Sequence, residues 1–174
     1  RGDLPAAQRG VAEEQLGGAD ERRDVGQHGA ARAVVRRGGD VIQEESDMWV
    51  RKHGLVRHSH PAWTSGGKLP AKYVIHAVGP VWGEGDEDRK LAEAVTGSLL
   101  AADRLELASL AMPAVSTGIF GFPKERAAGA ILSAIERFFI DKPESTVNLV
   151  QMILYDPPTL EAFTKVWREK GWGK

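Results

Sequence analysis

A loop of eight residues, 116–123, contains the residue types that could hold a phosphate. Its sequence is STGIFGFP, and it lies between an apolar run and an amphipathic run. Gly118 and Gly121 remove side chains where a backbone must approach an anion closely, and Ser116 and Thr117 add hydroxyl donors. Between a strand and a helix, loop amides and the helix N-terminus converge on anions. The loop is interpreted as a diphosphate cradle, or alternatively as an ordinary turn that uses glycine for its geometry.

The histidines are the next residues with possible chemistry. His53, His58 and His60 lie in one segment, but no carboxylate accompanies them at a spacing useful for metal binding, so we expect no metal site. His76 lies inside an apolar run and is expected to be a hydrogen-bonded core or strand-end residue. The chain has no cysteine, which excludes a disulfide framework, a thiolate zinc site and a cysteine nucleophile.

The elements that position the loop follow an alternation of short apolar and longer amphipathic runs, which predicts a sheet covered by helices. Strands are predicted at residues 73–78, 110–115 and 147–155, the last of them buried on both faces because it is almost unbroken in apolar residues. Helices should follow each of these strands. Their buried faces are predicted to be Leu91, Val95, Ser98, Leu99, Ala102 and Leu105; Ala127, Ala128, Ile131, Leu132, Ile135, Phe138 and Phe139; and Leu160, Phe163, Val166 and Trp167.

Helix starts can also be read from the sequence. Pro123 suits the first turn of the second helix, and Thr159 is expected to cap the third. Asp40 and Gln43 resemble a capping box before a further helix, which would present Val41, Met48 and Trp49 on one face. Residues 1–37 contain no convincing strand, although a parallel sheet requires one there.

Composition limits the class of protein. A chain of 174 residues with 42% hydrophobic content is expected to form one domain, residues 1–174. Lys and Arg number 23 against 24 Asp and Glu, so a net charge of -1 provides no global field toward nucleic acid or an anionic membrane. No apolar run approaches the roughly 20 residues of a membrane helix. We expect a soluble, cytoplasmic monomer with neither a membrane nor a nucleic-acid partner.

Two segments together resemble successive signatures of the macro domain family. They are LPAKYVIHAVGP at residues 69–80 and AMPAVSTGIFGFP at residues 111–123. The helix between them, the helix after the loop and the late strand ending at Asp156 follow the family's order, so the resemblance extends from Val41 to the C-terminus. It implies an α/β fold of three α/β/α layers, with a mixed, mostly parallel central sheet. The ligand it implies is ADP-ribose, free or attached to a protein or another acceptor, with no cofactor.

The resemblance also assigns roles to residues. It places Ser116, Thr117, Gly118, Ile119, Phe120 and Gly121 around the diphosphate and the distal ribose, with Phe120 beside that ribose. Tyr155 is expected to pack on the adenine; the alternative is a strand-end residue half buried against Pro157. Asp3 matches a position whose carboxylate accepts a hydrogen bond from the adenine amino group, and a solvated Asp is the alternative.

Residues 4–32 match the family poorly, and the family's first strand is not recognisable before them. The Asn-rich step aligns with Gly17, Gly18, Ala19 and Asp20, and the glycine run aligns with residues 27–31. Either this loop has diverged, or its residues are not those that the gene encodes, as after a frame error. Asp20 could orient a water and His28 could exchange a proton; otherwise both are solvated loop residues.

The resemblance therefore leaves open whether the chain is an enzyme. The first hypothesis is an ADP-ribose-binding domain that hydrolyses mono-ADP-ribosyl esters, O-acetyl-ADP-ribose or ADP-ribose 1''-phosphate. The second is a reader module that binds ADP-ribosylated partners without chemistry. The third, a nucleic-acid-binding domain, conflicts with the near-zero net charge and the absence of a basic stripe.

Overall fold

The protein alternates strands and helices along the chain. The structure, a computed structural model, describes residues 9–14 and 29–172. Its elements are β1 (Arg9–Glu14), α1 (Gly29–Gly38), α2 (Val41–His53), β2 (Ala62–Ser65), β3 (Tyr73–Ala77), α3 (Glu87–Arg104), β4 (Ser109–Pro113), α4 (Lys124–Asp141), β5 (Leu149–Ile153) and α5 (Pro157–Glu169). The predicted alternation is confirmed.

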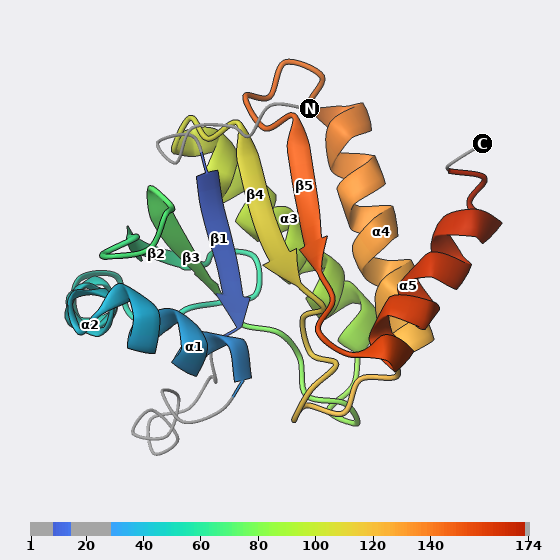
Figure 1. The fold of residues 1–174 in the computed structure, drawn as a ribbon, viewed down its shortest axis with the longest axis horizontal. Helices are drawn as coiled ribbons and strands as arrows, with labels where there is room; N and C mark the ends of the chain where they lie inside the picture. The colour runs from blue at the N-terminus through green and yellow to red at the C-terminus, as the bar shows by residue number, and fades with distance from the viewer. Residues whose placement is uncertain (1–8, 15–28, 173–174) are drawn as a thin grey trace.

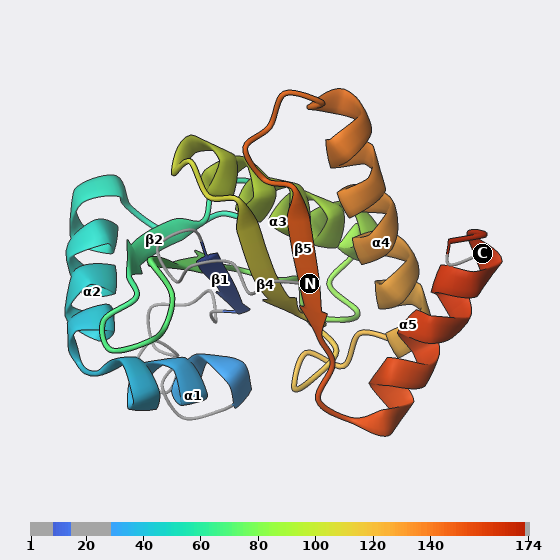
Figure 2. The same cartoon turned by 45° about the horizontal axis from the view of Figure 1, so that its top comes forward.

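The strands form one sheet in the order β2-β3-β1-β4-β5. β3, β1, β4 and β5 are parallel, and β2 joins the β3 edge in antiparallel orientation. Figures 1 and 2 show α1 and α2 on one face of the sheet and α3 and α4 on the other, with α5 beside α4. The three-layer α/β/α fold with a mixed, mostly parallel sheet is confirmed.

The central strand is β1, in the segment where the sequence showed no convincing strand. Its sequence, RGVAEE, has a single β-branched residue and ends in two acids. It is nevertheless paired on both sides, for example Gly10 with Tyr73 of β3 and with Leu110 of β4. This segment is a strand because its backbone pairs with two apolar neighbouring strands. Such tertiary context overrides a weak local β-propensity.

The core lies mainly between the sheet and the α3/α4 layer. Ile75, Leu110 and Met112 of the sheet are fully buried there. The predicted apolar faces of α3 and α4 are confirmed for most of their residues, because Leu91, Val95, Leu99, Ile131, Leu132 and Phe138 are all buried in this cluster. Leu105, just after α3, and Phe139 are only partly buried against it. α3 ends where the loop before β4 begins, and α4 begins where the loop after β4 ends. The packing of these two helices therefore positions both loops.

Other expectations about burial were wrong. β5 pairs only with β4 among the described strands, and Leu149 and Ile153 are 40% and 57% exposed, because β5 lies at the edge of the described sheet. On α5, Phe163 is buried as predicted, but Leu160 and Trp167 are exposed and the buried neighbours are Thr159 and Ala162. α5 lies against the side of α4, so only a narrow stripe of the α5 surface is buried.

Helix starts also differ from the expectation. Asp156, not Thr159, caps α5, because its carboxylate accepts a hydrogen bond from the Thr159 N–H at 3.0 Å. Asp40 precedes α2 without a side-chain cap, and Gln43 donates to Asp47. The buried residues of α2 are Ile42 and Ser46, while Val41 and Met48 are exposed. None of the described helices is long and apolar enough to cross a membrane.

Candidate functional site

The candidate site lies at the edge of the sheet toward which the parallel strands point. The arrowheads of β1, β4 and β5 reach this edge in Figure 1, and the loops 78–86, 114–123 and 154–156 begin there. Two contacts join these loops. The Trp82 N–H donates to the Phe120 carbonyl at 2.9 Å, and the Lys124 ammonium donates to Asp156 at 2.5 Å. Ligands of open α/β sheets collect at such an edge.

Loop 114–123 is held by its own hydrogen bonds. The N–H and the hydroxyl of Thr117 both donate to the Ala114 carbonyl, at 3.2 and 2.7 Å, and the Phe122 N–H donates to the Ser116 carbonyl at 3.0 Å. Ser116 is fully buried. The sequence suggested that the two hydroxyls donate to a phosphate; here the Thr117 hydroxyl is used inside the loop. The Thr117 side chain therefore stabilises the shape of the loop.

Two backbone positions show how tightly this shape is set. Gly121 has φ of +68°, which side chains disfavour, so glycine is the favoured residue there. Ser116 adopts φ of +67°, a left-handed conformation that costs on the order of 1–2 kcal/mol for a residue with a Cβ atom. Strain of this kind persists where the surrounding structure imposes it, and it is concentrated at functional sites.

The outer side of the loop offers space and hydrogen-bond donors. A Cβ atom added at Gly118 or Gly121 would meet no atom of residues 9–14 or 29–172 within 4 Å. Within residues 9–14 and 29–172, no backbone carbonyl accepts from the N–H groups of Gly118, Ile119 or Phe120. α4 begins directly after the loop, and Pro123 provides no side-chain cap for its first amides. Exposed amides beside an uncapped helix N-terminus suit an anion.

Aromatic side chains surround the loop at its β3 side. Phe120 is only 7% exposed and lines a pocket of about 470 Å³ together with Val78 and Val81. Trp82 packs on Phe122 with ring centroids 5.0 Å apart, and the Arg126 guanidinium lies 5.1 Å from the Trp82 ring. The sequence analysis did not single out Trp82, which lies in an acidic, glycine-containing loop.

Charged groups hold the α3 and α4 starts together behind these rings. Arg126 donates to both oxygens of Asp88, and this hydrogen bonding lowers the pKa of Asp88 below its usual value. Glu87 accepts from the N–H groups of Gly83 and Gly85, and backbone hydrogen bonds lower its pKa. Both carboxylates are therefore ionised supports of the loop 78–86 at neutral pH.

At the β5 side, Tyr155 is completely exposed. The alternative in which it is half buried against Pro157 is therefore wrong. The next residue, Asp156, is fixed by Lys124 and by the Thr159 hydroxyl at 2.7 Å. The hydrogen bond from Lys124 is the main cause that lowers the pKa of Asp156 to about 2. Lys124 follows the loop 114–123 directly, so this ion pair fixes the base of Tyr155 relative to the loop.

The remaining candidate residues lie elsewhere. His76 is fully buried and hydrogen-bonded to the Thr64 hydroxyl at 2.9 Å, as expected. The three histidines of the segment 53–60 contact separate partners, and the part of the chain that the structure describes contains no group of metal-binding side chains. Asp3, Asp20 and His28 lie outside the described residues.

A family model for the macro domain matches residues 18–131 of this chain. The chain belongs to the macro domain family. A macro domain-containing protein of Caldanaerobacter subterraneus is 37% identical over 147 residues, which cover 83% of this chain and 82% of the relative. A protein of Pyrobaculum aerophilum is 47% identical over 141 residues, covering 81% and 76%. A protein of Thermotoga maritima is 50% identical over 144 residues, but this macro domain spans only about a quarter of it (82% of this chain and 23% of the relative).

Solved macrodomains share the fold. The macrodomain of Oceanobacillus iheyensis with ADP superposes with a TM-score of 0.81 at 22% identity, covering 92% of this chain and 83% of that one. The Trypanosoma brucei macrodomain in complex with ADP-ribose gives a TM-score of 0.76 at 22% identity, covering 92% and 63%. At this level of identity the likeness concerns the fold.

Proposed function

We propose that this macro domain binds ADP-ribose at the edge formed by loop 114–123 and Tyr155. The observation that carries the proposal is the set of N–H groups at Gly118, Ile119 and Phe120, for which no described backbone carbonyl is an acceptor. A diphosphate needs several donors in close reach, and glycine at position 118 leaves room for it. The adjacent start of α4 adds a favourable partial positive charge.

The two ends of the ligand have partners on either side of the diphosphate. Tyr155, fully exposed on a base fixed by the Lys124–Asp156 pair, offers its ring to the adenine. Phe120, on the opposite side of the loop, would lie beside the distal ribose, and Asp3 would accept from the adenine amino group. The fold neighbours crystallised with ADP or ADP-ribose support this choice of ligand.

Calorimetric titration with ADP-ribose tests the binding, with AMP and NAD as comparison ligands. AMP has the adenine but only one phosphate, and NAD carries a nicotinamide in place of the anomeric hydroxyl of the distal ribose. We expect ADP-ribose to bind most tightly and to raise the melting temperature by mass action. The absence of both heat and thermal shift at millimolar ADP-ribose would contradict the proposal.

For the chemistry after binding, we propose slow hydrolysis of mono-ADP-ribosyl esters, which consumes one water and releases ADP-ribose and the free acid. Its candidate groups are Asp20, to orient the water, and His28, to exchange a proton. A reader without chemistry is the second candidate, because two of the described carboxylates at this edge, Asp88 and Asp156, are already engaged by Arg126 and Lys124.

Release of ADP-ribose from a glutamate- or aspartate-modified protein separates the two. We expect slow or no release. If release is slow, Asp20→Ala and His28→Ala should each reduce it. No release by any of the three proteins, with binding intact, identifies a reader. Fast turnover that neither substitution changes would show that the catalytic groups lie in another segment.

A further inference from the structure

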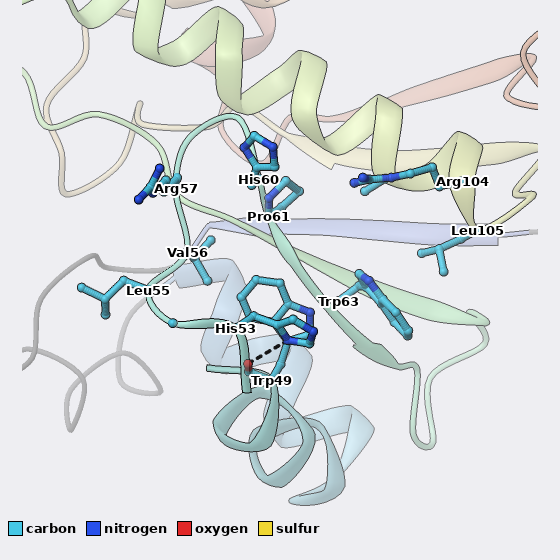
Figure 3. Close-up of a pocket in the computed structure, with 12 residues that line it drawn as sticks. Trp49, His53, Leu55, Val56, Arg57, His60, Pro61, Trp63, Arg104 and Leu105 are labelled. Atoms are coloured by element: carbon cyan, nitrogen blue, oxygen red, sulfur yellow. Dashed lines mark hydrogen bonds between the residues drawn. The ribbon is translucent and has the colours of Figure 1, made fainter. Parts of the chain in front are cut away.

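A second and larger pocket lies away from loop 114–123 and Tyr155. It has a volume of about 1060 Å³ and is formed by the end of α2, the segment 54–61, β2 and the end of α3. Figure 3 shows the rings of Trp49, His53 and Trp63 on one side of it, and on another Arg104, at the end of α3, with Leu105 directly after it. The macro domain function proposed above makes no use of this pocket.

The pocket is rich in flat side chains. Trp49 and His53, one turn apart on α2, have ring centroids 4.6 Å apart. Trp63 is 43% exposed, and its ring contacts Tyr73 edge-on at 5.8 Å. A tryptophan that is braced at its edge and open to solvent can stack on a flat heteroaromatic ring, and every nucleobase has such a face.

The charge of the pocket has one sign. Among the described residues that line it, the charged side chains are Arg57 and Arg104, and none is acidic; His53 and His60 also line it. Neither arginine forms an ion pair with a carboxylate of residues 9–14 or 29–172. A ligand that joins an aromatic ring to an anionic group complements this arrangement.

We propose that this pocket binds a nucleotide, with the base on Trp63 and the phosphate at Arg57 or Arg104. The source can be a free nucleotide or an unpaired stretch of nucleic acid, because both present the same ring and phosphate. The net charge of -1 concerns only the long-range field, whereas this cluster acts at contact distance. A planar guanidinium group can donate two parallel hydrogen bonds to one phosphate, and Arg57 and Arg104 each provide such a group.

Tryptophan fluorescence and anisotropy measure the binding of thymidine 5'-monophosphate and of a labelled oligothymidylate of about ten residues. Thymine avoids the adenine partner proposed for Tyr155, and each titration is repeated with ADP-ribose at saturation. A blunt duplex of the same length serves as a ligand without free base faces. The variants are Trp63→Ala and Arg104→Gln. Trp167→Ala, at 45% exposure on α5, and Arg137→Gln on α4 are their matched controls.

We expect saturable binding that ADP-ribose does not displace and that the duplex does not reproduce. Trp63→Ala should weaken it about tenfold or more, and Arg104→Gln should reduce its salt dependence by about 0.7 in the slope of log K against log salt, as one lost phosphate contact predicts. Both controls should bind like the parent. Equal affinity for the monophosphate and the oligonucleotide identifies a free nucleotide as the source, and tighter oligonucleotide binding identifies a strand.

Three results would overturn the proposal. The first is no saturation by either thymidine ligand at millimolar concentration. The second is equal binding by Trp63→Ala and Trp167→Ala. The third is competition by polyglutamate as effective as competition by the oligonucleotide, which would show a site for acidic protein segments. ADP-ribose binding at loop 114–123 is measured separately, so its failure would leave this test unaffected.

Discussion

Replacing Gly118 tests the proposed diphosphate site by separating size from charge. A Cβ atom at this position meets no atom of the described part of the chain within 4 Å, so Gly118→Gln and Gly118→Glu should each change the free energy of unfolding by less than about 0.5 kcal/mol. In the complex, both side chains would intrude on the diphosphate. Only the glutamate adds a negative charge, so the difference between the two variants isolates the electrostatic repulsion.

That repulsion can be estimated from Coulomb's law. Unit charges about 4 Å apart repel by about 1 kcal/mol at the dielectric constant of water and by about 4 kcal/mol at a value typical of protein surfaces. Gly118→Glu should therefore bind ADP-ribose roughly fivefold to several hundredfold more weakly than Gly118→Gln. The difference should shrink as salt rises, because an exposed pair is screened.

Calorimetry at two salt concentrations, with urea unfolding of the same samples, provides the two readouts. A folded Gly118→Glu protein that binds ADP-ribose as well as Gly118→Gln would refute the placement of the diphosphate at this loop. A glutamate variant that is unfolded would instead refute the inference that the loop has open space on its outer side.

Three further predictions concern the adenine platform, the pH dependence of stability and the core. Tyr155→Ala should weaken ADP-ribose binding by about 1–3 kcal/mol, whereas Tyr155→Phe keeps the ring and should bind like the parent; equal affinity of all three in calorimetry would exclude a stacking role. The pKa of Asp156 is lowered from 3.8 to about 2, so the stability it contributes is complete above about pH 4 and is lost as the pH falls toward 2. Urea unfolding at stepped pH should show this loss, and Lys124→Met should make it shallower; an unchanged slope would contradict the pairing. Leu99→Ala, in the core, should cost about 2–5 kcal/mol, and Leu160→Ala, at 53% exposure, less than about 1 kcal/mol; thermal unfolding that shifts both equally would contradict the packing described.

The sequence predicted those elements whose apolar spacing matches their burial. α3 and α4 repeat apolar residues at helical spacing because one full side of each covers the sheet. The burial of β5 on both faces was wrongly predicted, because an apolar run alone does not show whether a second strand or layer covers the strand. β1 could not be found locally, since RGVAEE is a strand through pairing with β3 and β4. Such pairing depends on residues distant in the chain.

The loop of the candidate site could be predicted from the sequence, but the contacts that hold the loop and Tyr155 in place could not. The glycines of loop 114–123 and the strand-end Tyr155 stood out by type and position. The Lys124–Asp156 pair did not, because it joins residues from two loops across the site. A local signal for Asp156 was present, since an acid directly before two prolines, with Thr159 three positions later, is typical of a helix N-cap. The aromatic and basic pocket could not be predicted either, because its residues come from α2, β2 and α3, which are far apart in the sequence.

The central place of β1 has a consequence for how the molecule is made. Gly10 pairs with Tyr73 and Arg9 pairs with Ser109, so the first described strand must wait for two partners synthesised much later. Until it is paired, β2–β3 and β4–β5 are separate two-stranded units, and such units have little stability alone. Contacts this distant in sequence slow folding. The closing of the sheet around β1 should therefore be a late, rate-limiting event, during which the inner edges of both units are open to wrong pairing with other chains.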